Sequence, residues 1–385
     1  MRPPAASKAR DRRSAVAVGV CLILAAPLAG CTALLRDNRD AWLREPARVR
    51  DDPTWLVMFK AGVLVPARDI LTLEPLWRPL LRHGQAWNID PDGRVPPGSF
   101  WQPRSRRDLE PAALARGWGA GPPREPLELL KPKRRRDGRV ALLMRDADGR
   151  RFLVKPDAPE YPELGSTAAL VGARVMWALG YNVPETYIVR IANTGLADLD
   201  GRRAAAVAFL DNVRGHWHFD WFRYRRELRA LRLASAWIND VDRVGSNTLV
   251  VADGEVLRYY LIDFDSCLGS WQGRPKEPWR GYRYEWTPWL SPQGHPQLEP
   301  ISPALGRWAA DFDPWRWRPQ VPNNAFDHMT REDAAWIARQ IARLDEPRLR
   351  AIISAARLSR PADAERLLEI LMRRRQLVLA AAGGR

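Results

Sequence analysis

The chain has 385 residues, 18 of them tryptophan, and a formal net charge of +16 at pH 7. A positive charge this large attracts anionic lipid headgroups, other polyanions or nucleic acid. It favours an anionic partner and does not distinguish among these three. The length is ample for a large hydrophobic core and indicates either one large domain or two lobes.

The first thirty residues predict a secretory signal. A basic stretch that ends at Arg13 precedes an apolar run over residues 15–28. That run is too short to span a bilayer as a helix, and the order of basic and apolar parts is typical of an export signal. A hydrophobic anchor that stays attached to the protein is the alternative that the sequence leaves open.

Residues 1–30 end in Leu28-Ala29-Gly30 before Cys31, which resembles the lipobox of bacterial lipoproteins. The resemblance implies cleavage before Cys31, with lipid attached to its sulfur and to the new amino group. Thr32, in the place of Asp, implies sorting to the outer membrane. We therefore expect a lipid-anchored cell-envelope protein that faces the periplasm or the cell surface, and nucleic acid is not an expected partner.

The three cysteines agree with this interpretation. Cys21 leaves with the signal and Cys31 carries the lipid, so Cys267 remains alone and the mature chain cannot form an internal disulfide. An exported protein without disulfides must be stabilised by its core. We expect Cys267 to be a buried packing residue.

The first elements of the mature chain are irregular. Residues 31–130 are rich in proline, tryptophan and arginine and predict an extension with one short helix near 110–116. Two apolar runs, 139–145 and 151–155, then flank an Asp-Gly turn and predict a β-hairpin.

A helix and a strand are predicted after this hairpin. Apolar residues recur at helical spacing over 166–179, with Ser166 or Thr167 as the expected N-cap and Gly180 after the last turn. Residues 183–191 predict a strand.

The second half of the chain predicts a long helix, a hairpin and several further helices. The helix covers 227–238, and the hairpin strands cover 248–251 and 256–262 about the turn Asp253-Gly254. The C-terminal helices are expected near 331–344, 347–358 and 362–381. This order predicts a mixed α+β fold in two unequal lobes.

Oxygen-bearing side chains gather in the loop after the long helix. Asp242 and Asn247 lie five positions apart there, and Asp263 follows the second hairpin strand, twenty-one positions beyond Asp242. A helix–loop–hairpin arrangement can bring these groups together. Carboxylate and amide oxygens suit Mg²⁺ or Mn²⁺, and a carboxylate off the metal can accept a proton from a hydroxyl. Capping of turn amides by these side chains is the simpler alternative.

The pattern D-R-x-x-x-N, followed by I-D-F, resembles the catalytic loop and metal motif of the protein-kinase-like superfamily, nearest to its HipA and lipid-kinase-like branch. Residues 86–385 also resemble an uncharacterised group of exported bacterial proteins with kinase-like motifs. The resemblance implies a small β-rich N-lobe over 131–210 and a larger helical C-lobe over 211–385.

The resemblance also implies roles for five side chains. Asp242 would be the catalytic base, and Asn247 and Asp263 would hold Mg²⁺ or Mn²⁺. Asp265 departs from the pattern, and it would either add a metal ligand or repel phosphate. Lys155 would contact the phosphates of ATP or of another phosphoryl donor. The implied reaction is a phosphoryl transfer to a hydroxyl acceptor.

Three departures from the kinase pattern keep other functions open. The glycine-rich loop is reduced to Gly138, the motif glycine is replaced by Asp265, and Leu170 stands where a helix glutamate should pair with Lys155. Glu160 or Glu163 could replace that glutamate. The alternative to an enzyme is a degenerate kinase-like module that binds an anionic lipid, an envelope polyanion or a protein partner. A purely structural lipoprotein is the third alternative.

Overall fold

The computed structural model describes residues 85–134, 139–278, 298–321 and 323–383, all of which belong to one compact unit, Pro46–Arg385. The predicted signal over residues 1–30, Cys31 of the predicted lipobox and residues 31–84 of the extension lie outside the described residues. No helix within the described ranges is long and apolar enough to cross a membrane.

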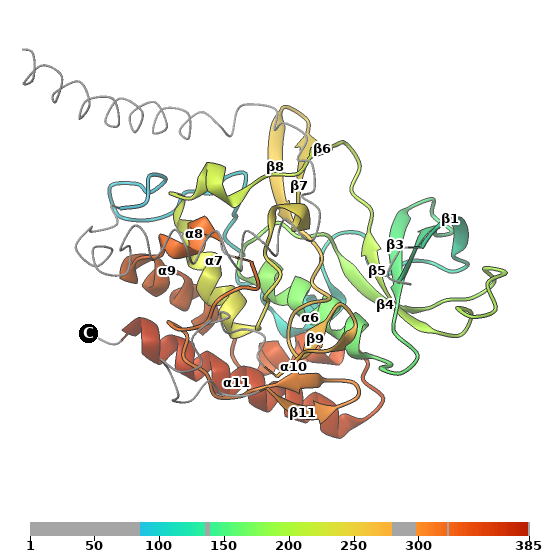
Figure 1. Cartoon of the computed structure of the whole chain (residues 1–385). Helices are drawn as coiled ribbons and strands as arrows, with labels where there is room; N and C mark the ends of the chain where they lie inside the picture. Colours follow the sequence, from blue (N-terminus) through green and yellow to red (C-terminus); the bar gives the residue numbers. More distant parts are fainter. Residues whose placement is uncertain (1–84, 135–138, 279–297, 322, 384–385) are drawn as a thin grey trace, which may run out of the picture. The chain divides into compact units, whose positions relative to one another are not determined.

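The smaller lobe is a five-stranded antiparallel sheet in the order β1-β2-β3-β5-β4 (Figure 1). Its strands are β1 (Glu128–Arg134), β2 (Val140–Arg145), β3 (Arg151–Pro156), β4 (Thr186–Arg190) and β5 (Arg203–Ala208). The predicted hairpin is confirmed as β2 and β3, with Leu142 opposite Val154. The strand predicted over 183–191 is confirmed as β4.

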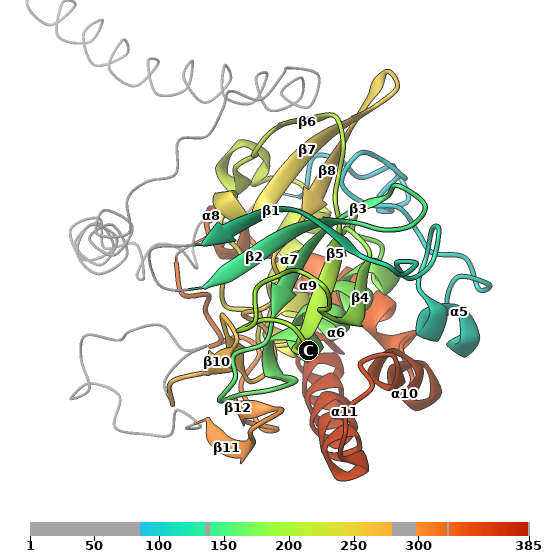
Figure 2. The same ribbon diagram turned by 90° about the vertical axis from the view of Figure 1, so that its right-hand side faces the viewer.

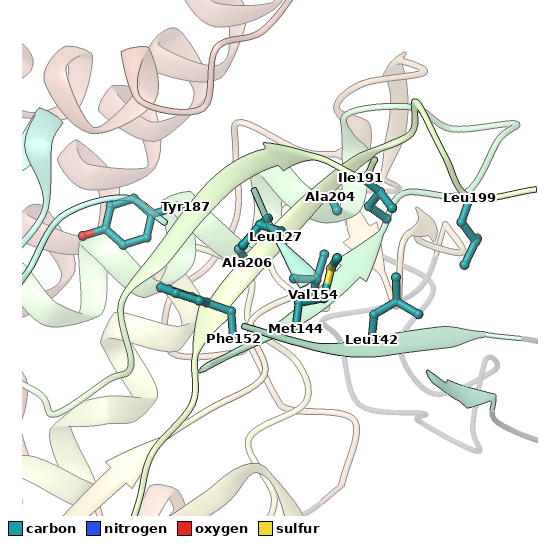
Figure 3. Packing of buried hydrophobic residues seen from close by; sticks show 10 residues of the cluster. All are labelled: Leu127, Leu142, Met144, Phe152, Val154, Tyr187, Ile191, Leu199, Ala204 and Ala206. Carbon is teal, nitrogen blue, oxygen red and sulfur yellow. The ribbon is translucent and has the colours of Figure 1, made fainter. Parts of the chain in front are cut away.

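Strand alternation divides the side chains of this sheet between two faces. Phe152 and Val154 point into a hydrophobic cluster with Leu142 and Met144, which Figure 3 shows from close by. Because successive side chains of a strand point to opposite faces, Lys155 points away from that cluster. The face that carries Lys155 lines the cavity at the candidate site described below.

Helix α6 (Leu164–Ala178) packs against β3, β4 and β5. It begins two residues before the predicted start, and its N-cap residue is Glu163, not Ser166 or Thr167. The carboxylate of Asp157 explains the earlier start, because it accepts hydrogen bonds from the backbone N–H groups of Glu163 and Ser166 at 2.9 and 2.7 Å. The hydroxyl of Ser166 donates to the same carboxylate at 2.6 Å.

The larger lobe is mainly helical. The predicted long helix is α7 (Arg226–Trp237), and the predicted C-terminal helices are α9 (Arg331–Ala342), α10 (Glu346–Ser354) and α11 (Pro361–Gly383). Thr330 and Asp333 form the capping box that starts α9. Figure 2 shows α11 and α10 on the side of the molecule away from β7 and β8.

Short elements complete this lobe. The hairpin of β7 (Thr248–Asp253) and β8 (Val256–Leu261) joins β6 (Val213–Gly215) in a three-stranded sheet. The remaining elements are α5 (Pro111–Arg116), the 3-10 helices η3 (Phe219–Phe222) and η4 (Gly245–Asn247), α8 (Asn324–Asp327), β9 (Ser270–Trp271), β10 (Arg274–Pro275), β11 (Glu299–Ser302) and β12 (Gly306–Trp308). The result is the two-lobed α+β fold, with a small antiparallel sheet and a larger helical part, that the resemblance implied.

The segment around Phe100 and Trp101 of the N-terminal extension packs on the larger lobe. Phe100 stacks on Tyr259 of β8 with ring centroids 4.1 Å apart, and Trp101 contacts Trp336 of α9 edge-on at 5.1 Å. Because both side chains are buried, the extension contributes to the core of this lobe.

Candidate functional site

Lys155 forms the link between the two lobes at the site. Its ammonium lies 2.6 Å from Asp263 Oδ1 and 3.4 Å from Asp265 Oδ2. Asp263 and Asp265 follow β8, so the contact joins strand β3 of the small lobe to the end of the hairpin in the large lobe. The structure thus brings together two of the side chains that the sequence singled out, Lys155 and Asp263.

These contacts change the proton affinities of all three groups. Burial alone would lower the pKa of Lys155, but the charges of Asp263 and Asp265 outweigh burial and raise it. Burial would raise the pKa of Asp263, yet the Lys155 ammonium lowers it below the ordinary range. Burial and then the charge of Asp263 raise the pKa of Asp265. Asp263 is therefore the carboxylate that stays ionised beside Lys155.

Arg243 fixes the backbone that carries Asp263. Its Nη1 donates to the carbonyl of Ile262 at 2.9 Å and its Nη2 to the carbonyl of Asp263 at 2.5 Å. Asp263 has a φ of 60°, in the left-handed region that few residues other than glycine adopt. The two hydrogen bonds from Arg243 hold the chain in this conformation, and the guanidinium also stacks on Phe264 at 4.5 Å.

Asp240 and Asn239 support the same loop from within. The buried carboxylate of Asp240 lies 2.7 Å from Nε of Arg243, and both side chains are fully buried. Asn239 Oδ1 accepts from the indole of Trp317 at 2.9 Å. Its backbone carbonyl accepts from the buried Lys276 ammonium at 2.5 Å. These two polar residues are therefore structural parts of the loop.

Asp242 lies close to the acidic residues after β8. Burial raises the pKa of Asp242 to about 7; the Arg243 charge opposes this, while Asp263 and other neighbouring carboxylates add to it. A carboxyl group with a pKa near neutrality can exchange a proton with a hydroxyl group at physiological pH. Nδ2 of Asn247 donates to the backbone carbonyl of Asp242 at 2.7 Å, so Asn247 stabilises this loop.

A cavity of ≈290 Å³ opens beside Lys155 and Asp265, between the small sheet, α6 and the segment of β9 and β10. Lys155 and Asp265 line it, with Ala169 of α6 and Ala205 of β5. The other charged side chains of its wall are Arg134, Arg139, Asp157, Glu160, Asp198, Arg202 and Arg274. Four of these residues are arginines, whose guanidinium groups can bind phosphate, and the other three are acidic.

The turn that would cover phosphates in a kinase is only partly described. Residues 135–138, which include Gly138, lie outside the described residues. Arg134 and Arg139 flank that turn and both line the cavity. Arg134 also forms an exposed ion pair with Asp198 at 3.5 Å.

The candidate metal ligands do not form a closed cage. Among the described residues, no group of three or more histidine, cysteine, aspartate or glutamate side chains is placed to hold a metal ion. The chemistry of the available donors still suits a hard cation, because Asp263 and Asp265 offer carboxylate oxygens and Asn247 has an amide oxygen. Mg²⁺ commonly takes one or two carboxylates and completes its shell with water and phosphate oxygens.

The helix glutamate of the kinase pattern is absent from this site. Leu170, which the sequence resemblance placed at that position, is buried in α6 and does not line the cavity at Lys155. Glu163 hydrogen-bonds to the backbone N–H of Ser359 at 3.0 Å, away from Lys155, while Glu160 lines the cavity. The partners of Lys155 in the structure are Asp263 and Asp265.

Sequence reasoning missed the roles of Arg243 and Lys276. Arg243 is the arginine of the D-R-x-x-x-N pattern, and that pattern gave no indication of a buried arginine that holds two carbonyls after β8. Lys276 lies in a proline-rich segment with no recognisable motif, and its burial arises from contacts with carbonyls of Asn239 and Leu268.

Similarity to known proteins is found among solved structures. No protein-family model and no curated protein matches the sequence. Among solved structures, the chain is similar to the proinflammatory kinase CtkA of Helicobacter pylori, with a TM-score of 0.39 and 12% sequence identity. That similarity covers 64% of this chain and 89% of the other. Because the TM-score is this low, no residue role is transferred from that kinase to this chain. The description of the fold and of the site rests on the strand order and the contacts above.

Proposed function

We propose that this protein is a kinase-like phosphotransferase that transfers a phosphoryl group from a nucleotide or another phosphorylated donor to a hydroxyl group. One observation supports this proposal above the others. Lys155 of the small lobe meets Asp263 and Asp265 of the large lobe at the edge of an arginine-lined cavity, with Asp242 nearby.

The reaction requires a base, a charge to stabilise the phosphates and a new bond to phosphorus. The acceptor oxygen attacks the terminal phosphorus, and the bond from phosphorus to the leaving phosphate oxygen breaks. Asp242 takes the proton of the acceptor hydroxyl, for which a pKa of about 7 is well matched. Lys155 stabilises negative charge on the donor phosphates.

The proposed cofactor is Mg²⁺ or Mn²⁺, which would be held by Asn247, Asp263 and Asp265. The ion would neutralise charge on the donor phosphates when it is bound. The short contact between Lys155 and Asp263 means that a donor must share or displace this ion pair. Donor and metal are therefore expected to bind together.

The proposed location is the cell envelope, with the protein attached to the membrane through acylated Cys31. The support is the order of basic run, apolar run and lipobox in the sequence. ATP is expected to be scarce beyond the inner membrane, so the donor could be another phosphorylated compound supplied in that compartment. Anionic lipid or an envelope polyanion is the expected partner of the basic surface.

A binding module without catalysis is the second candidate function. The observation that favours it is the ion pair of Lys155 with Asp263 and Asp265, which neutralises the lysine without any helix glutamate. In such a module the cavity would hold an anionic ligand and leave it unchanged.

Phosphoryl transfer from labelled ATP, polyphosphate or a phosphorylated sugar, assayed with Mg²⁺ and Mn²⁺, separates the two functions. The enzyme should transfer label to protein or to an added hydroxyl compound, and Asp242→Asn should lower the rate about 100-fold or more. Ligand binding without transfer, equal in the wild type and Asp242→Asn, would favour the binding module.

A further inference from the structure

A second cavity of ≈310 Å³ lies between α5, α6, β4 and the C-terminal end of α10. It shares no lining residue with the cavity at Lys155. We call it the arginine cavity, because Arg116, Arg174 and Arg357 line it together with apolar residues such as Leu170 and Ile188. None of the described residues that line it is acidic.

Arg174 is the buried arginine of this cavity, and backbone carbonyls hold its side chain in place. Its side chain is 2% exposed, and its Nη1 donates to the carbonyl of Leu114 and, at 2.5 Å, to that of Ala115. Within the described part of the chain its Nε has no hydrogen-bond partner. Burial lowers the pKa of Arg174, since the cation is removed from water. A nearby anion would stabilise this buried charge.

Arg357 adds a second cation in an unusual backbone conformation. Its φ is 51°, a region where glycine would be favoured, yet the chain places a large charged side chain there. Arg357 is exposed, and its charge also disfavours the charged form of Arg174. Arg116, the last residue of α5, is exposed as well. Three like charges around one cavity are unfavourable until an anion joins them.

Glu185, the carboxylate near the arginine cavity, already accepts a hydrogen bond from another side chain. Glu185 accepts the hydroxyl of Tyr187 at 2.7 Å, and its attraction to Arg174 is weaker than the effect of burial on that arginine. Burial raises the pKa of Glu185, so its negative charge is disfavoured at this place. Glu185 therefore does not replace an anionic ligand in the cavity.

The geometry points to a binding site for a small amphiphilic anion, an aliphatic chain that ends in a phosphate or carboxylate group. The apolar wall of Leu170, Ile188 and Ala115 would hold the chain, and Arg116 and Arg357 would contact the anionic end with Arg174 behind them. Free fatty acids, alkyl phosphates and anionic membrane lipids share this chemistry. The inference does not depend on the proposed phosphoryl transfer.

Isothermal titration of the full-length protein with decyl phosphate, decanoate, inorganic phosphate and decanol tests the inference. The amphiphilic anions should bind at least about tenfold more tightly than phosphate or decanol, because each of those provides only half of the interaction. If decyl phosphate binds more tightly than decanoate, the natural ligand carries a phosphate group. If decanoate binds more tightly, the ligand carries a carboxylate group. Decanol or inorganic phosphate binding as tightly as both anions would overturn the proposal.

Two variants locate the binding. Arg357→Gly removes one charge at a position whose φ suits glycine, so the fold should be preserved, and Arg116→Gln removes the other at a helix end. The double variant should weaken decyl phosphate binding about tenfold or more. Arg107→Ala, an exposed arginine outside the cavity, is the matched control and should bind as the wild type does. Unchanged binding in a folded double variant contradicts the assignment.

Two further experiments identify the source of the ligand and show which of the two cavities binds it. Phosphatidylglycerol vesicles that compete with decyl phosphate, where phosphatidylcholine vesicles do not, would assign the ligand to membrane lipid. Absence of competition would assign it to a free amphiphile. Asp263→Ala should leave decyl phosphate binding unchanged, whereas loss of binding in that variant would place the amphiphile at the Lys155 cavity and overturn the proposal.

Discussion

Lys155 and Asp263 are 108 positions apart in the chain, and their charged atoms lie 2.6 Å apart. Lys155 ends a strand of the small sheet, and Asp263 follows the hairpin of the large lobe, so this pair fixes the relation between the two halves of the site. Asp265 lies 3.4 Å from the same ammonium. Removal of the lysine would leave two carboxylates facing each other, which is the basis of the first prediction.

Lys155→Met should destabilise the protein by about 1.5–3 kcal/mol at neutral pH, as measured by urea unfolding. The loss has this size because hydrogen bonds to a charged group are broken and the two carboxylates repel each other. The double variant Lys155→Met with Asp263→Asn should recover part of the loss, since the repulsion is removed. Lys133→Met, on the exposed strand β1, is the control and should change stability by less than about 0.5 kcal/mol.

Arg243→Leu should cost about 3–5 kcal/mol of folding free energy, because the fully buried carboxylate of Asp240 would lose its partner. A second substitution, Asp240→Leu, should recover much of that loss when it is combined with the first. Chemical denaturation of the two single variants and the double variant measures the coupling. Additive losses would show that the two side chains do not stabilise each other.

The raised pKa of Asp242 predicts a pH dependence of stability. The folded state holds the proton to a pKa of about 7, while the ordinary value is 3.8, so the folded state binds more protons between these values. Stability should therefore fall as pH rises through this window. The amide side chain of the variant Asp242→Asn cannot ionise. The Tm of this variant relative to that of the wild type should therefore rise from acidic to neutral pH. A constant difference in Tm between the two proteins would contradict this prediction.

The lipobox predicts that the protein carries lipid. Cys31→Ser should abolish incorporation of labelled palmitate and shift the mature protein away from the membrane fraction. Cys267→Ser is the control, because the side chain of Cys267 is buried and donates to the carbonyl of Ala168 at 3.1 Å. Labelling that persists in Cys31→Ser would contradict acylation at this cysteine.

Local signals in the sequence predicted most of the regular elements. The hairpin of β2 and β3, helix α7 and the capping box of α9 each follow from residues that lie next to one another. Strand β5 was missed because its residues, RAAAVA, include four alanines, which are strong helix formers. Its strand conformation comes from pairing with β3 on one side and β4 on the other, which a local pattern does not contain.

The residues of the site that belong to sequence motifs could be predicted, and the contacts that support them could not. The D-R-x-x-x-N and I-D-F patterns indicated Asp242, Asn247 and Asp263 as candidates, and the resemblance to kinases indicated Lys155. The sequence did not indicate that Arg243 holds the carbonyls of Ile262 and Asp263, because that contact depends on how the loop folds back on β8. The start of α6 was missed for a similar reason, since its capping carboxylate, Asp157, comes from the end of β3.

We propose that Lys155, Asp263 and Asp265 form a site for a phosphorylated donor and a divalent ion. Thermal unfolding of the wild type and Asp263→Ala, each titrated with Mg²⁺ or Mn²⁺ and ATP together and singly, tests it most directly. The Tm of the wild type should rise only when ion and nucleotide are both present, and the Tm of Asp263→Ala should not respond. An equal rise in both proteins, or no rise with any phosphorylated donor, would contradict the claim.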